Sequence, residues 1–424
     1  MVKLWRASRW GVEAPAIGDV ARHASFVLFA VYAWLLPIEH TIAARNLVFF
    51  PLVLLTLWAG TRREGIRLRV PFAWAWMVYG AVALISLTYA INPAYSAGQI
   101  KDQILYAMLA LLVSAAWVNS VADFSKAVLV ITAGATFLIG SALYPAFVSA
   151  PFWGPHALDH YDAFNDGIGT FSTYLITTLP FIWAYRRQLP SGARTRRMAF
   201  MGVLAGGLVA LFLTTNRIGI IALAVEGGVA ATLSCAVRPT RCIGKKTVAA
   251  SVLIALVLVA LFFRIQEIRH LPLGADPRIR VIWPLAIRNI ESAPWSGGGF
   301  GIEAFTLRNP AFVAANTQFF HAHNMVLNKG VQMGIPGMVA FLLLWFGAVR
   351  AIWPSKVLLR ENRKAWGYLV AGITMSAGVF LKNMTDDFFT NDGLYLYLLI
   401  VGALVGMKSA TRDLGKPREA SGQG

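Results

Sequence analysis

Long apolar runs separated by short polar segments recur along the whole chain. A run of roughly 17 to 25 apolar residues is long enough to cross a bilayer as a helix. The runs and the polar residues between them predict about twelve transmembrane helices. We place them at residues 24–38, 45–60, 71–89, 103–118, 124–145, 169–185, 198–214, 218–236, 246–263, 325–349, 366–383 and 393–408.

The longest polar break, residues 264–322, separates the ninth and tenth predicted helices. Between Asp276 and Glu291 its apolar residues recur at helical spacing, which predicts an amphipathic helix lying on the membrane surface. These apolar positions are Ile279, Ile282, Trp283, Ala286, Ile287 and Ile290. The large loop therefore contains helices that are too polar to span the membrane.

A glycine cluster, Gly297 to Gly301, follows this helix after Pro294 and Trp295. Such clusters can cradle phosphates in nucleotide sites, but those sites have a strand before the loop and Gly-Lys-Ser/Thr within it. This chain has neither feature here. The cluster instead predicts a tight turn whose backbone lies close to a ligand or to another helix.

Composition supports a membrane protein, because 57% of the residues are hydrophobic and only 14% are charged. The net charge of +18 is carried by short basic clusters between apolar segments. A nucleic-acid site would instead gather basic residues in a patch with interleaved aromatics. We therefore expect the lipid bilayer, and no nucleic acid, as a partner. The whole chain, residues 1–424, is expected to form one transmembrane domain.

The basic clusters also predict the orientation. With a cytoplasmic N-terminus, every strongly basic connector falls on the cytoplasmic side, as the positive-inside rule requires. These connectors are residues 61–69, 186–197, 238–246, 350–364 and 408–418. The C-terminus is then cytoplasmic, with a disordered polar tail over residues 409–424, and the large loop faces the opposite side. The two cysteines, Cys235 and Cys242, lie near a cytoplasmic helix end, where no structural disulfide is expected.

Arginines are concentrated in the large loop, on the side where positive charge is normally scarce. They are Arg264, Arg269, Arg278, Arg280, Arg288 and Arg308. Arg217 stands apart from them, in the short turn Thr214 to Arg217 between two predicted helices. Charges at membrane depth are costly and often functional, and arginine forks suit anionic oxygens. These residues are candidates for binding an anionic ligand.

Two histidines, His321 and His323, end the large loop at the start of the tenth predicted helix. Residues two apart lie on different sides of a helix, and no neighbouring acid supplies a third metal ligand. We expect one histidine to act as a base or hydrogen-bond partner; the alternative is an interfacial histidine without a catalytic role.

The His- and Asp-rich segment 147–169 could resemble a metal site, but a polar loop capping the bundle is favoured. Glu226, in mid-helix, is either protonated or paired with a neighbouring helix.

Three patterns together resemble the O-antigen ligase family. They are His323-Asn324-x-x-Leu327 followed by Gly334, an arginine- and tryptophan-containing helix ending in Pro294-Trp295-x-Gly297-x-Gly299, and the earlier Asn216-Arg217 turn. The resemblance covers most of the chain and includes Gly169-Thr170-Phe171 before the sixth predicted helix. It implies a GT-C-like, all-α polytopic protein of the bacterial inner membrane with one large periplasmic loop. The family shares a superfamily with O-antigen polymerases and O-linked oligosaccharyltransferases.

The resemblance implies glycan transfer from undecaprenyl pyrophosphate to a sugar hydroxyl of lipid A-core, without metal or cofactor. Arg217 and one arginine of the Arg278/Arg280 pair would then bind the donor pyrophosphate. Two arginines flank the expected position relative to Trp283, so both are retained, with Arg280 preferred and Arg288 as a weaker candidate.

By the same resemblance His323 would be the general base, with His321 and Asn324 as secondary candidates. Direct attack opposite the leaving group would invert the anomeric centre. Two alternatives share the superfamily: an O-antigen polymerase and a protein O-oligosaccharyltransferase. A flippase for lipid-linked glycans is the alternative from another class; its charges should lie in a midplane cavity, whereas here they cluster at the outer surface.

Overall fold

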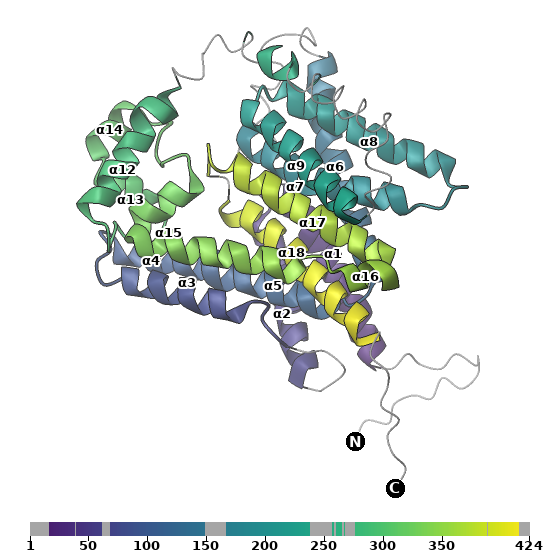
Figure 1. The fold of residues 1–424 in the computed structure, drawn as a ribbon. Helices are drawn as coiled ribbons and strands as arrows, with labels where there is room; N and C mark the ends of the chain where they lie inside the picture. Colours follow the sequence, from purple (N-terminus) through teal and green to yellow (C-terminus); the bar gives the residue numbers. More distant parts are fainter. Residues whose placement is uncertain are drawn as a thin grey trace.

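The computed structural model describes residues 17–38, 40–61, 68–148, 167–237, 257, 260–264, 267, 276–387 and 389–414. The regular structure of these residues is helical throughout, as expected for an all-α membrane protein. Figure 1 shows long helices packed side by side, with a group of short helices beside one end of the bundle. We call the end that carries residues 276–324 the loop end.

The long helices follow the apolar runs. They are α1 (Ile17–Leu35), α2 (Ile42–Thr61), α3 (Ala73–Ser86), α4 (Pro93–Ile100) with the π-helix η1 (Lys101–Tyr106) and α5 (Ala107–Trp117), α6 (Val121–Val148), α7 (Ile168–Gln188), α8 (Arg194–Leu213), α9 (Arg217–Val237), α15 (Met325–Ile352), α17 (Arg363–Lys382) and α18 (Asn391–Leu414). The shorter elements are the π-helix η3 (Arg278–Ile282), α12 (Trp283–Ser292), α13 (Glu303–Arg308), α14 (Pro310–Ala315) and α16 (Lys356–Glu361).

Eight helices within the described residues are long and apolar enough to cross a membrane. Two shorter apolar helices, α1 and α3, accompany them. A helix stands at every predicted position except 246–263, which lies almost entirely outside the described residues. The chain is therefore a polytopic membrane protein, while the total of about twelve spans and the GT-C-like assignment stay predictions.

Two expectations were wrong: where the polar tail begins, and that no disulfide forms. Helix α18 continues to Leu414, so the polar tail predicted from residue 409 begins too early, because the last turns of this apolar helix carry Lys408 and Thr411 inside the bundle. Residues 415–424 lie outside the described residues. Cys235, near the end of α9, is disulfide-bonded, contrary to expectation; Cys242 lies outside the described residues.

Close packing of small residues holds the C-terminal helix in the centre of the bundle. Helix α18 lies along α5, while α17 packs against α7 and α9 and α15 runs beside α3. A Cβ atom added at Gly402 or Gly406 of α18 would overlap the backbone carbonyls of α5. Small residues at such contacts let two membrane helices approach closely enough for dispersion forces to stabilise them. This packing fixes where α17 and α18 meet at the loop end.

The glycine cluster forms the tight turn that the sequence predicts, and its backbone packs against a helix. Gly298 and Gly299 donate backbone hydrogen bonds to the carbonyls of Val331 and Gln332 in α15, at 2.9 and 2.8 Å. Gly297, Gly299 and Gly301 all have positive φ, between 76° and 120°. A Cβ at Gly297 or Gly299 would also strike neighbouring atoms, so larger side chains are excluded there. The cluster anchors the short helices to α15.

A separate small core supports the same short helices. Its buried members are Ile282, Ala286, Ile290, Ala304, Phe305, Ala322 and Val331, drawn from η3, α12, α13, α15 and the segment just before α15. The predicted amphipathic stripe thus faces inward at three positions, whereas Ile279 and Ile287 remain exposed. The stripe is narrower than predicted because η3 is π-helical, which shifts the register of Ile279 relative to α12.

Candidate functional site

The two histidines lie together, in the segment just before α15. That helix begins at Met325, so neither histidine belongs to it. His323 adopts a left-handed backbone conformation with φ of 47°, which is uncommon for a residue other than glycine. The ring centroids of His321 and His323 are 3.9 Å apart. The expectation that they face different directions was wrong, because it assumed helical geometry for a segment that is not helical.

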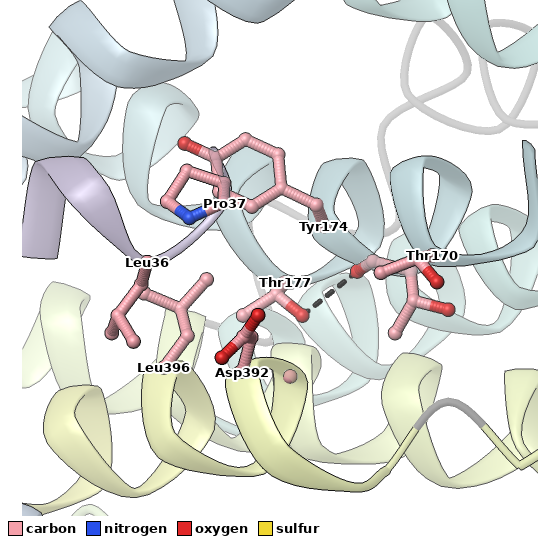
Figure 2. A pocket seen from close by; sticks show the side chains of 9 residues that line it. Leu36, Pro37, Thr170, Tyr174, Thr177, Asp392 and Leu396 are labelled. Atoms are coloured by element: carbon pink, nitrogen blue, oxygen red, sulfur yellow. Dashed lines mark hydrogen bonds between the residues drawn. The ribbon is translucent and has the colours of Figure 1, made fainter. Parts of the chain in front are cut away.

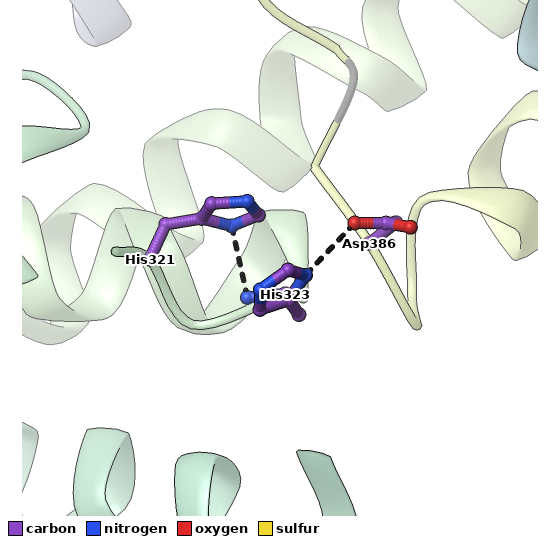
Figure 3. Close-up of side chains that lie close together, drawn as sticks. All are labelled: His321, His323 and Asp386. Carbon is purple, nitrogen blue, oxygen red and sulfur yellow. Dashed lines mark hydrogen bonds and ion pairs between the residues drawn. The ribbon is translucent and has the colours of Figure 1, made fainter. Parts of the chain in front are cut away.

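His323 is paired with an acid that the sequence analysis did not single out. Its Nδ1 lies 2.9 Å from Oδ1 of Asp386, in the connection between α17 and α18 (Figure 3). An ionised carboxylate only accepts hydrogen bonds, so Nδ1 carries the hydrogen and Nε2 holds the lone pair. Nε2 is buried and has no hydrogen-bond partner among the described residues. The structure therefore leaves one basic ring nitrogen available.

Asp386 is buried but remains ionised. Burial acts to raise its pKa, yet the hydrogen bond from His323 and the charges of Lys382 and Arg278 outweigh burial and hold the pKa below its ordinary value. Lys382 ends α17 and is completely buried. The carboxylate can thus orient His323 and stabilise a positive charge on that ring.

His321 acts on His323 through the backbone. Its Nδ1 accepts a hydrogen bond from the backbone N–H of His323 at 3.0 Å. Burial and the neighbouring His323 lower the pKa of His321 to about 3, so its ring is neutral near pH 7. A neutral ring can accept this bond, which helps to hold the left-handed conformation of His323.

Two of the predicted arginines meet through a shared aspartate. Nη2 of Arg217, at the start of α9, lies 3.1 Å from Oδ2 of Asp276. The other oxygen, Oδ1, accepts a hydrogen bond from the backbone N–H of Arg278 at 3.0 Å. Arg278 in turn donates to the carbonyl of Thr385 at 3.0 Å and lies 3.8 Å from Oδ2 of Asp386. Residues far apart in sequence are therefore joined in one chain from Arg217 to His323.

Arg280 and Arg288 lie on the same segment as Arg278. Both are exposed, whereas Arg278 is partly buried between its aspartate partners. Arg278 is held between Asp276, which accepts its backbone N–H, and Asp386, 3.8 Å from its guanidinium group. The geometry therefore favours Arg278 over Arg280 as the arginine beside His323.

Asn324 has a structural position in this arrangement. It is the N-cap of α15, where its Oδ1 accepts hydrogen bonds from the backbone of Val326 and Leu327, each at 3.0 Å. Its Nδ2 donates to the carbonyl of Met384 at 2.8 Å. Asn324 thus ties the start of α15 to the segment that carries Asp386.

Asp276, Lys382 and Asp386 are the residues that sequence reasoning missed. A signal was present for two of them, because Asp386 lies in the polar break after the predicted helix 366–383, and Lys382 is a charge in the last turn of that helix, on the same side of the membrane as the large loop. Asp276 directly precedes Pro277, a sequence typical of a helix start.

The donor atoms of His321, His323 and Asp386 lie within 4.8 Å of one another, close enough to share a metal ion. The expectation that no acid is near the histidines was therefore wrong. Arg278 and Lys382 act on the same carboxylate, and their positive charges oppose a divalent cation. Metal-independent chemistry stays a prediction. Segment 147–169, the other metal candidate, lies mostly outside the described residues.

Aromatic rings border the two histidines. Phe319 makes an edge contact with His323 at a centroid distance of 5.6 Å, and Phe320 does so with His321 at 4.7 Å. Phe320 is largely exposed, whereas Phe300 is fully buried. Two apolar rings thus border the histidines.

A second polar region lies at the loop end, where α1, α7 and α18 meet (Figure 2). It is a small hollow, partly open to solvent, lined by Leu36, Pro37, Thr170, Thr173, Tyr174, Thr177, Asp392, Gly393 and Leu396. The hydroxyls of Thr173 and Thr177 donate to carbonyls of their own helix, at 2.9 and 2.8 Å. Asp392 forms an ion pair with Arg45. The polar groups of this hollow are already satisfied.

Glu226 lies within the bundle, away from this chemistry. It is buried on α9 against Gly378 of α17, where a Cβ would overlap its carboxyl group. Its Oε1 has no hydrogen-bond partner among the described residues. This position fits a protonated carboxyl group better than an ion-paired one.

Comparison with known proteins gives one family match. Residues 200–342 match the family described as O-antigen ligase. No curated protein matches the chain. The matched segment contains Arg217, Arg278, His321 and His323, and it ends before Lys382 and Asp386.

Proposed function

We propose that the protein transfers an O-antigen glycan from undecaprenyl pyrophosphate to a sugar hydroxyl of lipid A-core. The premise is that residues 200–342 match the O-antigen ligase family. The transfer would take place in the periplasmic leaflet of the bacterial inner membrane. Family membership supports an enzyme that acts on lipid-linked glycans. The observation that carries the proposal is the buried His323–Asp386 pair with its unpartnered Nε2.

In the proposed reaction, Nε2 of His323 takes the proton of the acceptor hydroxyl as its oxygen attacks the anomeric carbon. The bond from that carbon to the pyrophosphate oxygen breaks, and undecaprenyl pyrophosphate leaves with the bonding electrons. Asp386 stabilises the imidazolium that forms. A positioned base of this kind contributes roughly 10²- to 10⁴-fold to the rate. The single displacement inverts the anomeric centre.

The leaving pyrophosphate needs positive charge, and Arg278 and Arg217 supply it. Hydrogen bonds from guanidinium groups to phosphate oxygens both position the donor and stabilise the charge that develops as the glycosidic bond breaks. Arg278 already lies beside Asp386, so a pyrophosphate bound to it would be close to His323. Arg280 and Arg288, which are exposed on the same segment, are second candidates for contacts to the donor.

No energy source from the cytoplasm is needed, because cleavage of the pyrophosphate ester drives the transfer. Both substrates carry lipid tails, so the site should open to the bilayer as well as to the periplasm. Phe319 and Phe320 stand where such a lateral opening would pass the histidines. Metal and cofactor are expected to be dispensable.

The product identifies the function. We would reconstitute the purified protein with undecaprenyl-pyrophosphate glycan and lipid A-core, in the presence of a chelator. Lipid A-core carrying the glycan supports the ligase. Extension of the lipid-linked donor would show a polymerase, and glycosylation of added protein an oligosaccharyltransferase. A flippase would instead move the donor between leaflets without transferring the glycan. This movement would be abolished by Glu226→Gln and unaffected by His323→Ala.

A further inference from the structure

Asn328, in the first turns of α15, hydrogen-bonds to both segments that carry the His323–Asp386 pair. Its Oδ1 accepts a hydrogen bond from the backbone N–H of Ala322 at 2.7 Å. Its Nδ2 donates to Oδ2 of Asp387. Because a backbone N–H can only donate, the first contact fixes the amide orientation, and the second presents the NH₂ group to the carboxylate. Asn328 therefore joins the residue before His323 to the residue after Asp386.

The two adjacent acids divide their contacts. Asp386 and Asp387 lie between α17 and α18, outside either helix. Asp386 reaches His323, while Asp387 reaches Asn328. A shift of this segment would consequently move both contacts together. A contact that fixes the position of Asp387 therefore also fixes the position of Asp386.

The Asn328 contacts are shielded from water. Ala322 and Asn328 are buried, and so is Asp387. Solvent cannot replace a buried hydrogen bond, so its loss leaves a donor or acceptor unpaired. The nearby bonds from Asn324 to Met384 and from Met325 to Asn383 hold the start of α15, but neither restrains Ala322.

His323 needs such restraint because of its backbone. A non-glycine residue with φ of 47° keeps that conformation only when its surroundings hold it. The restraint comes from two sides: Asn328 holds Ala322, and Nδ1 of His321 accepts the N–H of His323. Nε2 of His323 is aimed by this backbone conformation together with the bond to Asp386.

We propose that Asn328 and Asp387 are a positioning pair, which sets the ring of His323 against Asp386 without touching either substrate. The catalytic consequence rests on the proposed transfer reaction. A positioning role predicts a fall in kcat with little change in the KM for the donor, because the arginines that bind pyrophosphate are not altered.

The test exchanges the two side chains. In Asn328→Asp two carboxylates face each other, and kcat should fall about tenfold or more. The double variant Asn328→Asp with Asp387→Asn keeps the bond from the Ala322 N–H and restores the bond between the two side chains with donor and acceptor reversed, so kcat should recover most of this loss. Asn316→Asp is the matched control, because the Asn316 side chain bonds to the carbonyl of Phe312, in the preceding helix α14, and not to the segments that carry His323 and Asp386. Its kcat should equal that of the wild type.

A second measurement does not depend on transfer. In Asn328→Leu the amide of Ala322 should exchange with deuterium faster than in wild type, while amides in α17 and α18 stay protected. Unchanged exchange at Ala322, full activity of Asn328→Asp, or a folded double variant as impaired as Asn328→Asp would each overturn the pairing. If the wild type transfers no glycan but exchange at Ala322 rises as expected, the ligase proposal fails and the pairing is supported.

Discussion

Two polar regions lie at the loop end, and they differ in what their residues can do. The hollow between α1, α7 and α18 has three threonines and the Arg45–Asp392 ion pair, and the hydroxyls of Thr173 and Thr177 donate to backbone carbonyls. The region before α15 has two histidines, an aspartate and arginines, with Nε2 of His323 buried and unpartnered among the described residues. In the first region the polar groups stabilise the fold. In the second region, Nε2 of His323 remains available as a base.

The comparison teaches that polar content alone does not mark a reactive site. A buried nitrogen without a partner costs free energy, and proteins retain such groups where they are used. The hollow contains an ionisable group, Asp392, but this group is balanced by Arg45. The predictions below test whether this difference corresponds to a difference in activity.

The largest effect should come from His323→Ala. Removing the base should lower the transfer rate roughly 10²- to 10⁴-fold, because the basic Nε2 that Asp386 orients is lost with the ring. The rate would be measured in proteoliposomes, with thermal unfolding as the check on folding. A folded His323→Ala variant with the wild-type rate would remove the distinction between the two regions.

Asp386→Asn should have the next largest effect, a loss of roughly 10²-fold, near the lower end of the range for a positioned base. The amide can donate to Nδ1 and so favour the tautomer with hydrogen on Nε2, which cannot accept a proton. The donor KM should change little, which separates this variant from an arginine variant. Asp392→Asn, in the hollow, is the matched control and should keep its rate.

Arginine variants should affect donor binding. Arg278→Ala should raise the donor KM about 10- to 100-fold, since a hydrogen bond to a charged group contributes ~1.5–3 kcal/mol. Arg280→Ala should have a smaller effect, because Arg280 is exposed while Arg278 lies beside Asp386. A larger rise for Arg280→Ala would show that Arg280 is the donor ligand and that the segment rearranges when the donor binds.

The smallest effect should be on stability against acid. The pKa of His321 falls from an ordinary 6.5 to about 3 on folding, mainly by burial. Between these values the unfolded chain binds more protons than the folded protein, so stability falls as the pH is lowered from about 6.5. Asp386, whose pKa is also lowered, loses its contribution only below its ordinary value of 3.8. His321→Gln should flatten the decline of Tm between pH 6.5 and 4; an unchanged slope would contradict this assignment.

The sequence predicted most of the helices, and it named several of the residues that the structure brings together. Apolar runs located the helices, because bilayer thickness fixes their length. Charges on the side where charge is scarce drew attention to the arginines, and the family resemblance named Arg217, the Arg278/Arg280 pair and His323, with Arg280 preferred to Arg278. The pairing of His323 with Asp386 could not be predicted, because it depends on how α17 and α18 meet and on a left-handed residue ahead of α15. The choice between Arg278 and Arg280 depended on helix rotation within η3, which periodicity did not resolve.

The most direct test of the central claim is single-turnover glycan transfer to lipid A-core by wild type, His323→Ala and Asp386→Asn, with the donor prebound and saturating. The account predicts a fast step in wild type, a step slowed about 10²-fold in Asp386→Asn, and a still slower one in His323→Ala, all with donor bound. Equal single-turnover rates in folded wild type and His323→Ala would contradict it, because His323 could not then be the base.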